Sequence, residues 1–135
     1  MAIKTNEMQE FEKETDIERF IRLVITKNIE RIEYERDHVC REHLKPMVDL
    51  YWTLEDWEQK AAIVDLLQDT IDNLSRPIML DFLNAPCDEV GDYLQKCKII
   101  ALCHLEENFS SFTRYCKNIE LIQPAVEKFL KETKK

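Results

Sequence analysis

The sequence predicts an all-helical protein, and three observations lead to this prediction. The chain has one glycine and four prolines in 135 residues, which leaves little material for the tight turns of β-hairpins. Runs that alternate apolar and polar residues, as half-buried strands do, are missing. Apolar residues instead recur at the spacing of one helix face through every long segment.

The chain divides into a short polar segment and one domain. Residues 1–14 are polar and have no clear periodicity, so we expect a frayed terminus there. From Asp16, apolar side chains recur at helical spacing, and the first helix is expected to continue to about residue 39. Residues 15–135 are predicted to form a single all-helical domain, since the length matches one core.

Prolines and acidic residues mark the starts of the later helices. Pro46 is expected to open a short helix, because the first helical turn tolerates proline. Thr53 and Asp56 have the spacing of a capping box, which predicts a helix over residues 53–73. Further helices are expected at residues 75–83, 88–106, 109–116 and from residue 124 onward.

Two parts of the chain repeat one pattern. Residues 45–48 and 76–79 are similar, and Pro46 and Pro77 within them are 31 residues apart. Each of these short helices is followed by an acidic turn and a long helix. A repeat of this length favours a short α-solenoid-like stack of antiparallel helical hairpins. The alternative is an irregular helical bundle whose hairpins only look alike.

The second unit resembles a HEAT repeat. Residues 77–83, the acidic turn at residues 86–90 and the apolar run at residues 94–102 follow the order of that family: a first helix with proline, an acidic turn, and a valine opening the second helix. The resemblance covers about residues 46–106. The family usually has a basic residue after that valine, where this chain has Gly91. The resemblance implies stacked helical hairpins.

Composition and charge narrow the function classes. Hydrophobic residues make 44% of the chain and charged residues 34%, a mixture typical of folded proteins in solution. The sequence contains no membrane-length apolar run and no secretory signal at its N-terminus, so a cytoplasmic location is expected. The net charge of −8 opposes binding to nucleic acid and to anionic membranes.

Signatures of catalysis and metal binding are weak. The five cysteines form no C-x-x-C pair, so we expect them to be reduced and metal-free. Glu35 and His38 share a helix face as in di-iron bundles, but this motif has no second copy. His104 lies in an apolar stripe, where a structural role is commoner than general-base catalysis. We expect a non-enzymatic protein without a cofactor. The alternative is a metal-dependent helical-bundle enzyme that uses Glu35, His38 and His104.

Acidic residues cluster on one side of the helix predicted over residues 53–73. Four of them lie within about 60° on a helical wheel, with no basic residue among them: Glu58, Asp65, Asp69 and Asp72. Like charges at this spacing destabilise an isolated helix, so selection for stability alone would tend to remove this acidic stripe. The stripe therefore favours a role in binding. The alternative is a solvated surface that aids solubility. The neighbouring turn and helix start extend the stripe. The candidate binding residues are Glu58, Asp65, Asp69, Asp72, Asp88 and Asp92.

Tyr51 and Trp52 complete the candidate surface. Adjacent residues on one short helix cannot both point inward, so one of the two is expected to be exposed as a binding anchor. Together these features predict a protein-binding domain that docks on a partner with a basic patch. The specific expectation is an adaptor, or an inhibitor of the immunity kind that neutralises a cationic effector. A structural subunit of a larger assembly is a further alternative.

Overall fold

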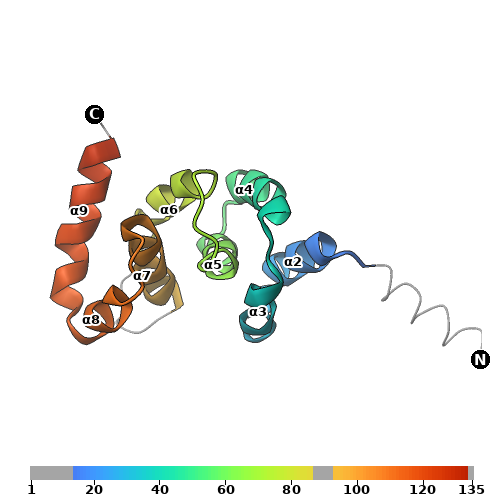
Figure 1. Cartoon of the computed structure of the whole chain (residues 1–135), viewed down its shortest axis with the longest axis horizontal. Helices are drawn as coiled ribbons and strands as arrows, with labels where there is room; N and C mark the ends of the chain where they lie inside the picture. The colour runs from blue at the N-terminus through green and yellow to red at the C-terminus, as the bar shows by residue number, and fades with distance from the viewer. Residues whose placement is uncertain (1–13, 87–92, 134–135) are drawn as a thin grey trace, which may run out of the picture.

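The computed structural model describes residues 14–86 and 93–133, and these residues form helices joined by turns, with no strand among them (Figure 1). The all-helical prediction is confirmed. The α-helices are α2 (Asp16–Ile25), α3 (Ile29–Glu35), α4 (Leu44–Thr53), α5 (Trp57–Leu66), α6 (Arg76–Phe82), α7 (Tyr93–Glu106), α8 (Ser111–Lys117) and α9 (Ile122–Thr133). The 3-10 turns are η1 (Arg36–His38), η2 (Arg41–His43) and η3 (Ile119–Leu121).

Consecutive helices alternate between two layers. The helices α2, α4 and α6 pack side by side in the first layer, and α3, α5 and α7 pack in the second. Consecutive helices also contact each other across the layers: α2 contacts α3, α4 contacts α5, and α6 contacts α7. At one end, α9 packs against both α6 and α7 (Figure 1). This packing order is that of neighbouring helical hairpins. Their relation to HEAT repeats stays a prediction.

The first predicted helix is interrupted. We expected one helix to about residue 39, but α2 ends at Ile25 and α3 begins at Ile29. Lys27 adopts the left-handed conformation, with φ of 55°, and the Asn28 N–H then bonds back to the Leu23 carbonyl at 2.9 Å. The Asn28 side chain accepts the next helix's Arg31 N–H at 3.3 Å. Asparagine thus closes one helix and caps the next.

The second long helix is shorter than predicted at both ends. Its N-cap is Asp56, whose carboxylate accepts the Glu58 N–H at 2.8 Å, and not Thr53. It ends at Leu66 instead of continuing to residue 73. Beyond that point the carbonyl of Gln68 accepts a hydrogen bond from the His104 ring at 3.4 Å. A long-range contact therefore takes the place of a helical hydrogen bond.

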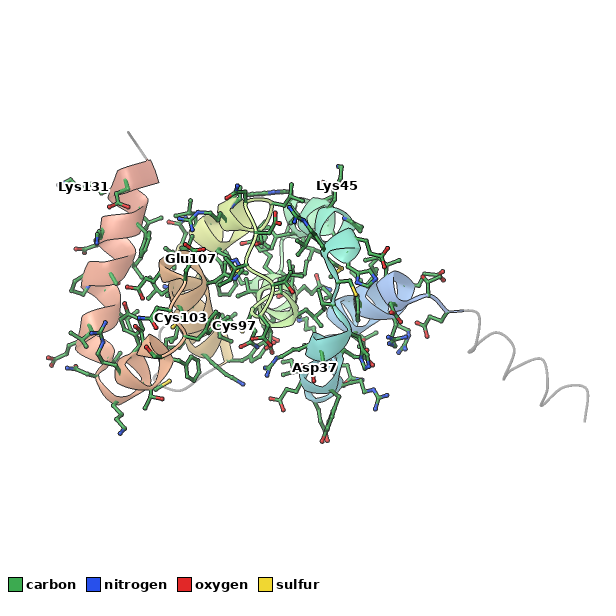
Figure 2. The ribbon with its side chains drawn as sticks, in the orientation of Figure 1. Asp37, Lys45, Cys97, Cys103, Glu107 and Lys131 are labelled. Atoms are coloured by element: carbon green, nitrogen blue, oxygen red, sulfur yellow. The ribbon has the colours of Figure 1, made fainter. Side chains whose placement is uncertain are left out.

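One apolar cluster runs through both layers, from Phe20 in α2 to Val126 in α9. Within α7, every residue from Ile99 to Leu105 is buried, as expected for a helix covered on all sides. Figure 2 shows Cys97 and Cys103 on this helix inside the array, with Lys45 and Lys131 at its outer edge. Within the described ranges, none of the helices combines the length and the apolar composition needed to cross a bilayer.

Candidate functional site

Asp65 is fully buried between the helices. Its carboxylate accepts hydrogen bonds from three side chains: Arg36 Nε at 2.8 Å, the Tyr93 hydroxyl at 2.7 Å and Gln68 Nε2 at 2.9 Å. The side chain is 0% exposed. The prediction that Asp65 faces a partner is wrong, because α3 covers one side of α5 and α7 covers the other.

Arg36, Asp65 and Tyr93 form a polar ladder across the second layer. They come from η1, α5 and the first residue of α7, at spacings of 29 and 28 residues. Burial raises the pKa of the Tyr93 hydroxyl, and the nearby Cys97 thiol and Asp65 carboxylate add to this effect. Every member of the ladder has intramolecular partners, which suits it to joining helices rather than binding a ligand.

The rest of the predicted acidic stripe does not share one helix face. Glu58 is exposed on the first turn of α5, 3.8 Å from the Lys27 ammonium. Asp69 is exposed and Asp72 half-buried, but both follow the end of α5, and Asp72 pairs with Arg41 at 3.1 Å. The ten residues of α5 span about 15 Å, so the helix separates the two groups. The prediction of a single acidic helix face is therefore wrong. The two remaining members of the predicted surface, Asp88 and Asp92, lie outside the described residues.

Tyr51 and Trp52 divide as the sequence predicts, with one side chain inside and one outside. Tyr51 is fully buried, and its hydroxyl donates to the Asp81 carboxylate at 2.8 Å. Trp52 is 53% exposed at the end of α4. Trp52 is consequently the aromatic side chain of this pair that is available to a partner, whereas Tyr51 fixes α4 to α6.

Trp52 borders an apolar hollow of about 520 Å³. The hollow lies where α4, α6 and α9 meet, and its volume is within the range of about 300–1,000 Å³ usual for ligand pockets. Its apolar walls are Pro77 and Leu80 on α6 and Leu130 on α9, in addition to Trp52. The polar residues at its edge are Asn73, Arg76, Asp81 and Asn84.

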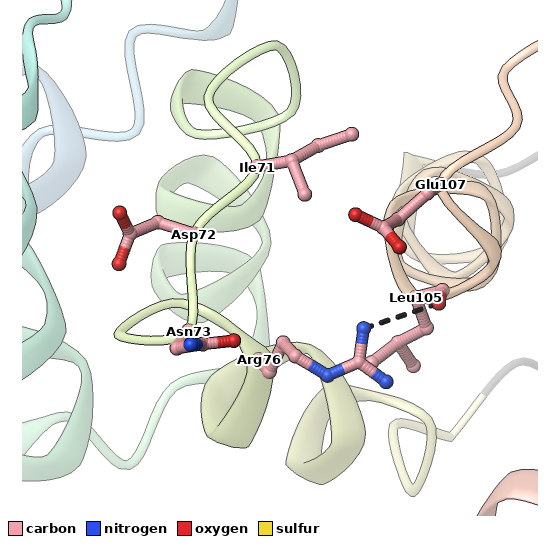
Figure 3. Close-up of a pocket in the computed structure, with 6 residues that line it drawn as sticks. All are labelled: Ile71, Asp72, Asn73, Arg76, Leu105 and Glu107. Atoms are coloured by element: carbon pink, nitrogen blue, oxygen red, sulfur yellow. Dashed lines mark hydrogen bonds between the residues drawn. The ribbon is translucent and has the colours of Figure 1, made fainter.

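A polar hollow of about 530 Å³ adjoins the first (Figure 3). It lies between the turn that follows α5 and the C-terminal end of α7. Figure 3 shows the Glu107 carboxylate and the Ile71 side chain extending into the space above Arg76, whereas the Asp72 carboxylate points the other way. The lining residues are Ile71, Asp72, Asn73, Arg76, Leu105 and Glu107. We call the two adjoining hollows the two-hollow surface.

Asn73 and Arg76 belong to both hollows. The Arg76 guanidinium donates through Nη1 to the Leu105 carbonyl at 3.2 Å, near the end of α7, where free carbonyls carry partial negative charge. Within the described ranges, Arg76 has no carboxylate within 4.0 Å and the Asn73 side-chain amide has no hydrogen-bond partner. The junction of the hollows thus presents polar groups that remain available to a ligand.

Glu107 owes its position to the way α7 ends. It adopts the left-handed conformation, with φ of 55°, and the Asn108 N–H bonds back to the Cys103 carbonyl at 3.0 Å. Glycine is the usual residue at this position. A glutamate here places its carboxylate at the polar hollow, and no ion-pair partner for it lies within residues 14–86 and 93–133.

The residues of the alternative enzyme prediction have separate structural partners. His104 is fully buried, with Nε2 at 3.0 Å from the Ser75 hydroxyl, and burial lowers its pKa. Glu35 is buried beside Arg19 Nε at 3.0 Å and His38 Nδ1 at 3.1 Å. In the part of the chain that the structure describes, no group of three or more His, Cys, Asp or Glu side chains is arranged to hold a metal ion.

The comparisons with known proteins add no relative. No family model, no curated protein and no solved structure shows significant similarity to the chain.

Three residues of the two-hollow surface were not predicted from the sequence: Asn73, Arg76 and Glu107. Of these three, Arg76 had a signal in the sequence, because it is the single basic residue between residues 61 and 95.

Proposed function

We propose that this chain is a non-enzymatic protein-binding domain whose partner docks on the two-hollow surface. The observation that carries the proposal is Trp52, which is 53% exposed beside an apolar hollow. Exposed tryptophans next to a pocket are frequent anchors of protein interfaces. Ile71, which is 41% exposed on the turn after α5, adds apolar area at the polar hollow.

The partner proposed is a protein with a basic patch. The chain has a net charge of −8, the Glu107 carboxylate extends into the polar hollow, and Asp69 is exposed on the turn after α5. Charge complementarity of this kind accelerates association and suppresses wrong partners. It supports a cytoplasmic adaptor or an immunity-type inhibitor that neutralises a cationic effector. The buried Asp65 is no part of this docking surface.

The test is the effect of Trp52→Ala on partner capture. The immobilised chain would be used to purify the partner from an extract of its own cells, and affinity would then be measured with purified components. We expect Trp52→Ala to weaken binding by at least about tenfold, with the thermal unfolding midpoint unchanged. Tyr34→Ala is the matched control, because Tyr34 is 68% exposed on α3 and borders neither hollow. Equal loss in both variants, or none in Trp52→Ala, contradicts the proposal.

A further inference from the structure

The turn between α5 and α6, residues 67–75, has little buried surface of its own. Its two ends, Leu67 and Ser75, are fully buried. Most of the residues between them are exposed: Asp69, Ile71, Asn73 and Leu74. A segment of this kind opens locally at a lower free energy than the packed helices on either side of it.

His104 in α7 contacts both parts of this turn. Its Nδ1 lies 3.4 Å from the Gln68 carbonyl near the start of the turn, and its Nε2 lies 3.0 Å from the Ser75 hydroxyl at the end. Among the described residues, the turn's other polar side-chain contact with a distant part of the chain is the ion pair of Asp72 with Arg41, whose side chain is 84% exposed. Exposed pairs contribute little to stability. His104 therefore provides the polar connection that holds the turn against α7.

The neutral imidazole ring satisfies both contacts. A carbonyl oxygen can only accept, so the single ring proton lies on Nδ1 and is donated to Gln68, while Nε2 accepts from the Ser75 hydroxyl. A second proton on Nε2 makes that nitrogen a donor, and the hydroxyl then has to turn to the Asp72 carbonyl, 2.9 Å from Ser75 Oγ. The hydrogen bonds can be remade in this way, but a buried positive charge remains.

The surroundings of His104 oppose that charge. The ring is fully buried, and no carboxylate of the described residues lies within 4.0 Å of it. Burial lowers the pKa of His104 most, and the Arg76 guanidinium of α6 lowers it further. The hydrogen bond to Gln68 and the Glu107 carboxylate act in the opposite direction. The helices α5, α8 and α9 also pack against α7, but none of their described charged groups is among those that act on the ring.

We propose that His104 is a pH-sensitive switch, which releases the turn at residues 67–75 from α7 when it takes up a proton and so removes one wall of the polar hollow. Three of the six residues that line this hollow belong to the turn: Ile71, Asp72 and Asn73. In the open turn the ring is hydrated and binds a proton below about pH 6.5, so opening becomes more favourable as pH falls. Between pH 7.5 and 5.5 the equilibrium constant for opening should rise by up to about tenfold. The opening itself is independent of the proposed function, whereas its effect on a docked partner rests on it.

Native-state hydrogen exchange of the full-length chain at pH 7.5 and 5.5, corrected for the intrinsic exchange rate at each pH, measures this opening. The probes are the Thr70 and Ser75 amides, whose hydrogen bonds lie within the turn. We expect their protection to fall by up to about tenfold at pH 5.5. The internal control is the turn between α2 and α3, which has no histidine partner among the described residues. There the Lys27 and Asn28 amides bond to carbonyls of α2, and their protection should stay constant.

Two variants separate a switch from a merely structural contact. His104→Asn cannot take up a proton, so the protection of the turn should become independent of pH in this variant. Ser75→Ala removes one contact but keeps the ring, so the turn should open more at both pH values and retain its pH dependence. The switch is overturned by constant protection of the turn in the unmodified chain, or by a pH dependence that persists in His104→Asn. Should His104→Asn fail to fold, a Ser75→Ala variant whose turn is protected as before overturns it independently.

The purified partner supplies a functional measurement. Its affinity for the unmodified chain should weaken as pH falls from 7.5 to 5.5, by no more than about tenfold, because the binding-competent closed turn becomes less populated. The weakening should be smaller with His104→Asn, and an equal pH dependence in both chains overturns the link between the turn and docking. Trp52→Ala at pH 7.5 tests the proposed function separately, and its failure would leave the exchange result standing.

Discussion

The polar ladder of the second layer and the two-hollow surface treat polar side chains in opposite ways. In the ladder, the Asp65 carboxylate is fully buried and accepts from Arg36, Tyr93 and Gln68. At the two-hollow surface, Asn73 has no hydrogen-bond partner within the described residues. Polar groups whose hydrogen bonds are all made within the protein fix the arrangement of helices. Polar groups without a protein partner beside an apolar hollow retain the capacity to bind a ligand. The position of an acid in the sequence does not reveal which role it has.

The largest expected effect breaks the ladder. Asp65→Asn removes the charge that compensates Arg36 in a buried setting, so we expect the free energy of unfolding to fall by about 3 kcal/mol. Urea unfolding followed by circular dichroism measures this change. Asp69→Asn is the control, because Asp69 is exposed four residues away and should change stability by less than about 0.5 kcal/mol. Equal effects of the two substitutions would remove the distinction between ladder and surface.

The loss of stability in Asp65→Asn should also raise the reactivity of Cys97. This thiol is buried beside Tyr93, and burial, with the Asp65 charge adding to it, raises its pKa well above the ordinary value. Alkylation at neutral pH therefore requires opening of the helices. We expect Asp65→Asn to speed Cys97 labelling about a hundredfold, as 3 kcal/mol corresponds to about two factors of ten. Labelling of the exposed Cys116, followed by peptide mass spectrometry, should keep its rate.

Protonation of His104 should weaken the connection between α7 and the turn after α5. Burial holds the pKa of His104 below its ordinary value, so the folded protein keeps the ring neutral where the unfolded chain binds a proton. The unfolded state then binds more protons below about pH 6.5, and stability falls as pH decreases from there. We expect a loss of about 1 kcal/mol between pH 6.5 and 5.5, measured by urea unfolding. His104→Asn should flatten this slope, and an unchanged slope in that variant would show that another group causes the pH dependence.

Adjacent aromatic residues offer a smaller comparison. Tyr51→Phe removes the hydroxyl that donates to Asp81 at 2.8 Å, and we expect a loss of about 1 kcal/mol in the free energy of unfolding. Trp52→Phe keeps an exposed aromatic ring, so its stability should stay within about 0.5 kcal/mol. Thermal unfolding of both variants measures the difference. A larger loss in Trp52→Phe would mean that Trp52 belongs to the core and not to the docking surface.

Much of the fold could be predicted from the sequence, because helix class depends on local periodicity and on the near absence of glycine. The end of α5 could not, since no proline or glycine marks Leu66 and the contact that takes the Gln68 carbonyl comes from His104, 36 residues away. A helical wheel also could not show that Asp65 is covered by neighbours on both sides. It detects amphipathic helices at a surface, whereas α5 lies between α3 and α7.

The candidate site was predictable only in part. Of the pair Tyr51 and Trp52, the sequence required one side chain to be exposed, and the structure identifies Trp52. Asn73, Arg76 and Glu107 come from two turns and the start of α6, and they meet only through packing of α6 against α7. Single polar residues in turns have no spacing pattern, so no motif could have joined them in advance.

The smallest expected effect separates stability from binding at the two left-handed helix ends. Lys27 and Glu107 both have φ of 55°, where glycine avoids the steric cost that a Cβ atom brings. Glu107→Gly should therefore raise the free energy of unfolding by about 0.5–1 kcal/mol, after the greater freedom of glycine in the unfolded chain is counted. Lys27→Gly should gain less, because Lys27 also pairs with Asp56 at 2.5 Å at the surface. Urea unfolding measures both changes, and affinity for the purified partner supplies the second measurement. If Glu107 is kept for its charge, Glu107→Gly should make the protein more stable and a weaker binder, while Lys27→Gly leaves affinity unchanged. A Glu107→Gly variant that gains stability and binds the partner as tightly as before would show that the Glu107 carboxylate has no part in recognition.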